Sequence, residues 1–146
     1  MKKALIAILL SVASILSINA QESQKIVEQF FKNYQEKGCE SAVQIAAATN
    51  IWLQKDSEKV NNWGKRLSQM SNGKGDYCGF EVVETNRTGF SLIEYVCLVK
   101  HEKAPFKISI IVYKPKDKWQ LNNIIGGRNT QRNTPNKQFN KNARNK

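Results

Sequence analysis

The sequence predicts an α+β domain in which three helices are followed by a four-stranded antiparallel meander. Before Gly75, apolar residues recur at spacings of three and four, which is typical of amphipathic helices. After Gly75, blocks rich in β-branched and aromatic residues alternate with short turn segments, which is typical of strands. Because such short connections join only neighbouring antiparallel strands, we expect a meander with the helices packed on one face.

The helical half contains three apolar patterns. Ile26, Phe30 and Tyr34 form one stripe at helical spacing, and Gly38 stands where a glycine often ends a helix. The second pattern is rich in alanine, which allows close packing against a neighbour. The predicted helices cover residues 23–37, residues 40–49 and a segment from an N-cap at Ser57 to the glycines at 73 and 75.

The strand half contains four blocks separated by turn residues. The predicted strands cover residues 77–84, 90–100, 106–114 and 119–125. We place the first turn around Arg87 and Thr88, since the segment from Asn86 to Gly89 has turn chemistry. In that register, residues whose numbers sum to 175 face each other across the first hairpin.

The chain divides into three parts. Residues 1–20 resemble a secretory signal peptide, with Lys2 and Lys3 before the uncharged apolar run 4–18, and Ala20 at the expected cut. The alternative is an uncleaved membrane anchor, but the run is shorter than the ~20 residues of a membrane-spanning helix. We therefore predict a periplasmic or secreted protein with no transmembrane segment after cleavage, and its globular domain in residues 21–127.

The net charge of +11 lies mostly outside that domain. Residues 128–146 contain six Lys or Arg and no acid, which leaves +3 on residues 21–127 once Lys2 and Lys3 are also set aside. The last segment is rich in Asn and poor in apolar residues, so we predict a disordered basic tail. It serves either as an electrostatic arm for an anionic surface or as a solubilising end. The spaced charges lack interleaved aromatic residues, so we expect no nucleic-acid partner.

A family resemblance follows from the element order and the last hairpin. Three helices before an antiparallel sheet, with Tyr113-Lys114-Pro115 and Asp117-Lys118-Trp119 across that hairpin, resemble the nuclear-transport-factor-2-like, or cystatin-like cone, superfamily and its exported bacterial members. The resemblance covers about residues 22–127. It implies a curved sheet around a cavity that some members use for catalysis and others for binding, so the fold alone does not choose a function.

Only one pair of residues favours an enzyme. In the predicted register Glu81 lies opposite Glu94, and two carboxylates in a dry cavity would share a proton and supply a general acid or base. On a solvated face they would turn towards Lys side chains instead. His101, the single histidine, is interpreted as a solvated turn residue rather than a base. The sequence has no zinc spacing and no Gly-rich phosphate loop, so we expect neither a metal nor a cofactor.

Aromatic residues are the stronger candidates for a ligand site, because their rings combine apolar area with polar tips. They are also ordinary core and sheet residues. The candidate binding residues are Tyr34, Trp52, Tyr95, Tyr113 and Trp119.

The three cysteines suggest one disulfide. The same register places Cys78 opposite Cys97, and an exported protein matures where thiols oxidise. Cys39 would then remain free. The alternative is that all three are small apolar side chains, and the absence of a C-x-x-C pair argues against redox catalysis.

These observations favour an exported, non-catalytic module that binds a ligand or a partner. The alternative is a small cofactor-free isomerase or dehydratase-like enzyme that uses a cavity carboxylate. Candidate partners are a small molecule, a cell-envelope protein, an anionic surface reached through the tail, and a second copy of the chain packed through the sheet.

Overall fold

The computed structural model describes residues 21–127. In chain order the elements are a first helix over residues 21–37, α2 (Cys39–Ala47), α3 (Ile51–Gln54), α4 (Ser57–Ser71), β1 (Tyr77–Thr88), β2 (Leu92–His101), β3 (Phe106–Tyr113) and β4 (Gln120–Gly126). The strands pair as an antiparallel sheet in the order β1-β2-β3-β4. This arrangement confirms the predicted α+β class and the meander. The predicted signal peptide and tail lie outside the described residues.

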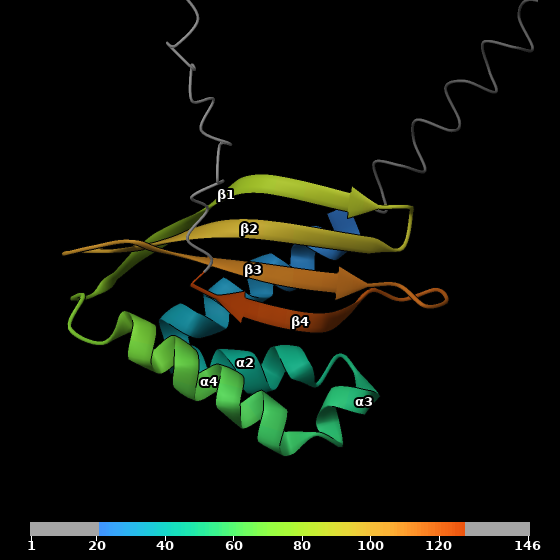
Figure 1. The fold of residues 1–146 in the computed structure, drawn as a ribbon, viewed down its shortest axis with the longest axis horizontal. Helices are drawn as coiled ribbons and strands as arrows, with labels where there is room; N and C mark the ends of the chain where they lie inside the picture. Colours follow the sequence, from blue (N-terminus) through green and yellow to red (C-terminus); the bar gives the residue numbers. More distant parts are fainter. Residues whose placement is uncertain (1–20, 128–146) are drawn as a thin grey trace, which may run out of the picture.

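The helices cover one face and one edge of the sheet. Figure 1 shows the first helix running behind the strands, while α2, α3 and α4 lie beyond β4. Both α2 and α4 contact β4, so that edge of the sheet is covered by helices. At the other edge, the side chains of β1 from Glu81 to Thr88 are exposed.

The core lies between the first helix and the inner face of the sheet. Along β2 every second side chain is buried, as expected for a strand with one covered face. From the helix, Phe31 reaches β1 and stacks on Phe80 with ring centroids 4.0 Å apart. Each fully buried large apolar side chain contributes on the order of 2 kcal/mol to this core. The first helix contributes Val27, Phe30, Phe31 and Tyr34 to the core, and the later helices contribute Ala42, Val43, Ala46, Ala47, Leu53, Val60 and Leu67.

The helix boundaries are close to those predicted, with two differences. Gly38 adopts φ 85 and separates the first helix from α2, as expected for a glycine at a helix end. The N-cap of α4 is Asp56 rather than the predicted Ser57, because the Asp56 carboxylate accepts the backbone N–H of Lys59 at 3.2 Å. The one-turn helix α3 was not predicted.

The predicted register of the first hairpin is wrong. Strand β1 continues to Thr88, which pairs with Leu92, so the turn lies at Gly89 and not at Arg87. Gly89 supplies the positive φ of 61 that the turn requires, whereas the polar residues before it remain extended. A shift in β1 between Val82 and Glu84 changes the register once more.

Candidate ligand site between the first helix and α2

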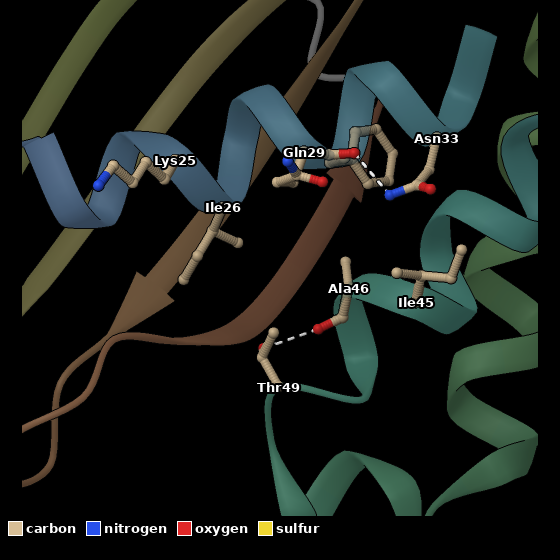
Figure 2. Close-up of a pocket in the computed structure, with 8 residues that line it drawn as sticks. Lys25, Ile26, Gln29, Asn33, Ile45, Ala46 and Thr49 are labelled. Carbon is tan, nitrogen blue, oxygen red and sulfur yellow. Dashed lines mark hydrogen bonds between the residues drawn. The ribbon is translucent and has the colours of Figure 1, made fainter. Parts of the chain in front are cut away.

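A groove with a volume of about 270 Å³ separates the first helix from α2. We call it the helix groove. Figure 2 shows Ile26 of the first helix and Ala46 of α2 pointing into it from opposite walls, while Lys25 extends along the first helix at one end. Its lining residues are Lys25, Ile26, Gln29, Phe30, Asn33, Ile45, Ala46 and Thr49.

Helical periodicity places one wall. Ile26, Phe30 and Asn33 are four and three positions apart, so they fall on one face of the first helix. Phe30 is fully buried and forms part of the floor. On the facing wall Ala46 is small and buried, while Ile45 is 40% exposed at the edge. The groove is open because Ala46 does not fill the space between the two helices.

The polar groups of the groove divide into satisfied and available ones. Asn33 is 8% exposed, and its amide Nδ2 donates to the Gln29 backbone oxygen at 2.8 Å. The Thr49 hydroxyl donates to the Ala46 backbone oxygen at 2.7 Å and accepts the Leu121 N–H at 2.9 Å. The side chains of Lys25 and Gln29 have no hydrogen-bond partner within residues 21–127. Those two side chains are therefore available to a ligand.

The turn after α2 is fixed to the sheet. The buried Asn50 side chain donates from Nδ2 to the Leu121 backbone oxygen at 2.8 Å, and its Oδ1 accepts the Trp52 N–H at 3.0 Å. Together with Thr49, this residue fastens the end of α2 to β4, because the two side chains bind the N–H and the C=O of the same residue, Leu121. This wall of the helix groove is thus positioned by side-chain to backbone hydrogen bonds.

The predicted aromatic binding set is not brought together at the helix groove. Tyr34, Tyr95 and Trp119 are buried in the core, Tyr113 is partly exposed, and Trp52 is 71% exposed. None of the five lines the groove. Strand and helix periodicity directs some of these rings into the core and others to the surface. Residue type alone does not reveal this separation.

Several of these rings have local polar contacts. The Tyr95 hydroxyl lies 2.6 Å from the Ser23 hydroxyl. The Trp52 ring lies under Lys55, and the Trp119 ring lies under Lys114, with Nζ to centroid distances of 5.1 and 5.4 Å. The indole Nε1 of Trp119 is buried without a hydrogen-bond partner among the residues described.

The predicted pair of facing carboxylates does not form, because the observed register of β1 against β2 differs from the predicted one. Glu81 pairs with Leu98 and forms an ion pair with Lys100 at 2.9 Å. Glu94 pairs with Asn86 and accepts its Nδ2 at 3.3 Å. The prediction that Glu81 and Glu94 face each other is therefore wrong, and Glu81 turns towards a lysine as the solvated alternative predicted.

The expected disulfide is also absent, for the same reason. Cys97 pairs with Val82, and Cys39, Cys78 and Cys97 are all free thiols. Cys78 is exposed whereas Cys97 is buried on the inner face. Burial raises the pKa of the Cys97 thiol to about 12, which makes it an inert apolar side chain at neutral pH.

His101 ends β2 and is part of an aromatic cluster rather than a turn. Its Nδ1 donates to the Gly75 backbone oxygen at 2.8 Å, and its Nε2 lies 3.1 Å from the Tyr34 hydroxyl. The Phe106 ring stacks on it with centroids 5.6 Å apart. Desolvation by burial raises the pKa of Tyr34, and it raises that of neighbouring Tyr77 to about 12. These contacts hold the first helix, the segment before β1 and the end of β2 together.

Sequence reasoning placed Ile26 and Phe30 in the apolar stripe and Ala46 in the alanine-rich helix, but it missed the other groove-lining residues. A signal was present beside that stripe, because Lys25, Gln29 and Asn33 follow one another at intervals of four residues along its edge. Within residues 21–127 no group of three His, Cys, Asp or Glu side chains is placed to hold a metal ion. In the same residues we find no helix with the length and apolar character needed to cross a membrane.

Comparison with known proteins adds no relative. No protein-family model matches the chain, and no match was found among curated proteins or solved structures. The resemblance to the cone superfamily therefore stays a prediction from the sequence.

Proposed function

We propose that this protein is an exported, non-catalytic binding module that holds a small, largely apolar ligand in the helix groove. The observation that carries the proposal is the groove itself, with an apolar floor and a few polar groups at its edge, the usual composition of a ligand site. Its volume of about 270 Å³ lies just below the ~300 Å³ at which pockets for drug-sized molecules begin, so the ligand is small.

The enzyme alternative has less support. No carboxylate lines the helix groove, and the two glutamates offered as an acid and base pair are engaged by Lys100 and Asn86 instead. Turnover of a substrate that is abolished by Glu94→Gln would nevertheless overturn the non-catalytic proposal.

Export is supported by the sequence of residues 1–20, with its two lysines, its apolar run and Ala20. The protein then acts in the periplasm or outside the cell. N-terminal sequencing of protein recovered from the periplasm or the medium is expected to begin at Gln21, and recovery only from the cytoplasm would refute export.

A neutral fluorescent probe tests the binding site. N-phenyl-1-naphthylamine is expected to brighten on titration with the protein and to saturate at one site per chain. Ala46→Leu adds three carbon atoms to the groove wall and should weaken binding of the probe at least fivefold. The matched control is Ala48→Leu, which adds the same side chain at an exposed position outside the lining. Equal effects of the two substitutions, or no probe binding, would refute the proposal.

A further inference from the structure

The helix groove is lined by one cation and no acid. Lys25 is the ionisable residue of the eight, and the other polar groups are amides and a hydroxyl. Figure 2 shows Lys25 at one end of the row of side chains, with Gln29 and Asn33 further along the same helix. The groove thus has an apolar floor and a positive charge at one end.

The Lys25 ammonium is not neutralised by its neighbours. The acids at helical spacing from it are Glu22 and Glu28, three positions away on either side. Glu28 accepts the amide Nε2 of Gln24 at 2.9 Å, and Lys25 forms no ion pair within residues 21–127. A lysine with a flexible apolar stem can lie along an apolar wall while its charge remains at the mouth.

A second donor stands one turn away. Gln29 follows Lys25 by four positions, so the two side chains lie on the same face of the first helix. The Gln29 amide has no hydrogen-bond partner among the described side chains and can donate from its NH₂ group. An ammonium and an amide at this spacing suit an anion with two acceptor oxygens, whereas a cationic ligand would be repelled.

The size of the groove limits the rest of the ligand. At ~30 Å³ per water molecule, a volume of about 270 Å³ corresponds to roughly nine waters, or an organic molecule of about ten non-hydrogen atoms. The apolar lining of Ile26, Phe30 and Ala46 accepts an unbranched alkyl chain better than a polar sugar or peptide. An eight-carbon monocarboxylate has this size and polarity.

We infer that the helix groove binds a medium-chain aliphatic carboxylate of about the size of octanoate. Its carboxylate lies at Lys25 and Gln29, and its alkyl chain lies over Phe30 and Ala46. This inference rests on the proposed function, because it assumes that the helix groove is the binding site, and it adds the chemical class of the ligand.

The experiment measures displacement of N-phenyl-1-naphthylamine from the purified protein by octanoate and by octan-1-ol, which lacks the negative charge. Octanoate is expected to displace the probe at about three- to tenfold lower concentration than the alcohol. Lys25→Met keeps the apolar stem and should abolish that difference while leaving the affinity for octan-1-ol within twofold. Lys25→Arg should restore the preference.

Lys32→Met is the matched control, because it removes the same charge from an exposed position of the same helix outside the groove. It should leave octanoate binding unchanged. If Lys25→Met and Lys32→Met lose affinity for octanoate equally, the attraction is a general effect of the protein's positive charge and the inference is overturned. Equal affinity of the wild type for acid and alcohol also overturns it, although the proposed function stands. Failure of the probe itself to bind refutes the proposed function instead.

Discussion

The Tyr34 hydroxyl and His101 Nε2 meet at 3.1 Å although the residues are 67 positions apart in the chain. Because the Gly75 carbonyl can only accept, His101 carries a proton on Nδ1, and in the neutral ring Nε2 accepts from Tyr34. This hydrogen bond joins the first helix to the end of β2. The first helix is also one wall of the helix groove, so the contact helps to hold that wall against the sheet.

Removing the Tyr34 hydroxyl should therefore weaken the fold. Tyr34→Phe keeps the ring and leaves Nε2 of the partly buried His101 unpaired, which is expected to lower the free energy of unfolding by about 1 kcal/mol. Urea denaturation measures the change. The matched control is Tyr113→Phe, which removes a hydroxyl from an exposed ring that has no side-chain hydrogen bond within residues 21–127, and it should change the stability by less than ~0.5 kcal/mol. Equal effects would show that the Tyr34 contact contributes nothing.

The buried Cys97 thiol should make the fold sensitive to alkali. Its pKa is raised by burial from the ordinary 9.0 to about 12, so the folded state holds this proton more tightly than the unfolded state does. The stability linked to the proton is complete below about pH 9 and is lost as the pH rises towards 12. Tyr77, with a pKa raised to about 12 from 10.0, adds a loss that begins about one pH unit higher.

The test is the melting temperature from pH 8 to 11 under reducing conditions. Cys97→Val should flatten the earlier part of the alkaline decline, because valine has no proton to lose. Cys78→Ser, at an exposed thiol, should leave the profile unchanged. An identical decline in wild type and Cys97→Val would refute the role of this thiol.

Periodicity predicted the elements well but not how the strands align. The alternation along β2 and the stripe through Ile26 and Phe30 depend on local spacing, so the class, the strand order and most boundaries could be derived. The register of β1 against β2 depends on which of several turn-forming residues makes the turn. Because the turn lies at Gly89 and not at Arg87, neither the expected carboxylate pair nor the expected cysteine pair is formed.

The helix groove could not be derived for a related reason. It is formed where two helices fail to fill the space between them, and that space depends on tertiary packing rather than on residue type. The aromatic residues singled out from the sequence are instead used in the core or on the surface. Lys25 and Gln29 are ordinary surface residues until the facing position of Ala46 is known.

Gly64 should resist replacement even by alanine. It is buried in α4, and a Cβ built there would stand 3.3 Å from Cα of Glu40 in α2. On an exposed helix Gly→Ala stabilises by about 1 kcal/mol, but here the added methyl group must push α4 away from α2. We expect Gly64→Ala to leave the free energy of unfolding unchanged or lower it by up to ~2 kcal/mol. If urea denaturation shows that the free energy of unfolding rises by about 1 kcal/mol, α4 can move away from α2 without a cost in stability.

Asn50 should connect the stability of the fold with ligand binding. Asn50→Ala removes both the hydrogen bond to the Leu121 backbone oxygen and the cap at the Trp52 N–H, and it leaves the buried carbonyl unpaired. The expected loss in the free energy of unfolding is about 2 to 3 kcal/mol. Because the same turn positions Thr49 in the groove wall, the affinity for N-phenyl-1-naphthylamine should fall as well, by threefold or more, at temperatures where the variant is still folded.

The matched control for that prediction is Asn61→Ala in α4. Asn61 also accepts a side-chain hydrogen bond, from Gln44 Nε2 at 2.6 Å, but this contact is exposed to solvent. Its removal should change the stability by less than ~0.5 kcal/mol and leave the probe affinity unaltered. If Asn50→Ala destabilises the protein while binding the probe as tightly as the wild type, the hydrogen bonds to β4 support the fold without positioning the wall. If folded Asn50→Ala loses probe affinity while Asn61→Ala does not, the hydrogen bonds to β4 position the wall of the helix groove.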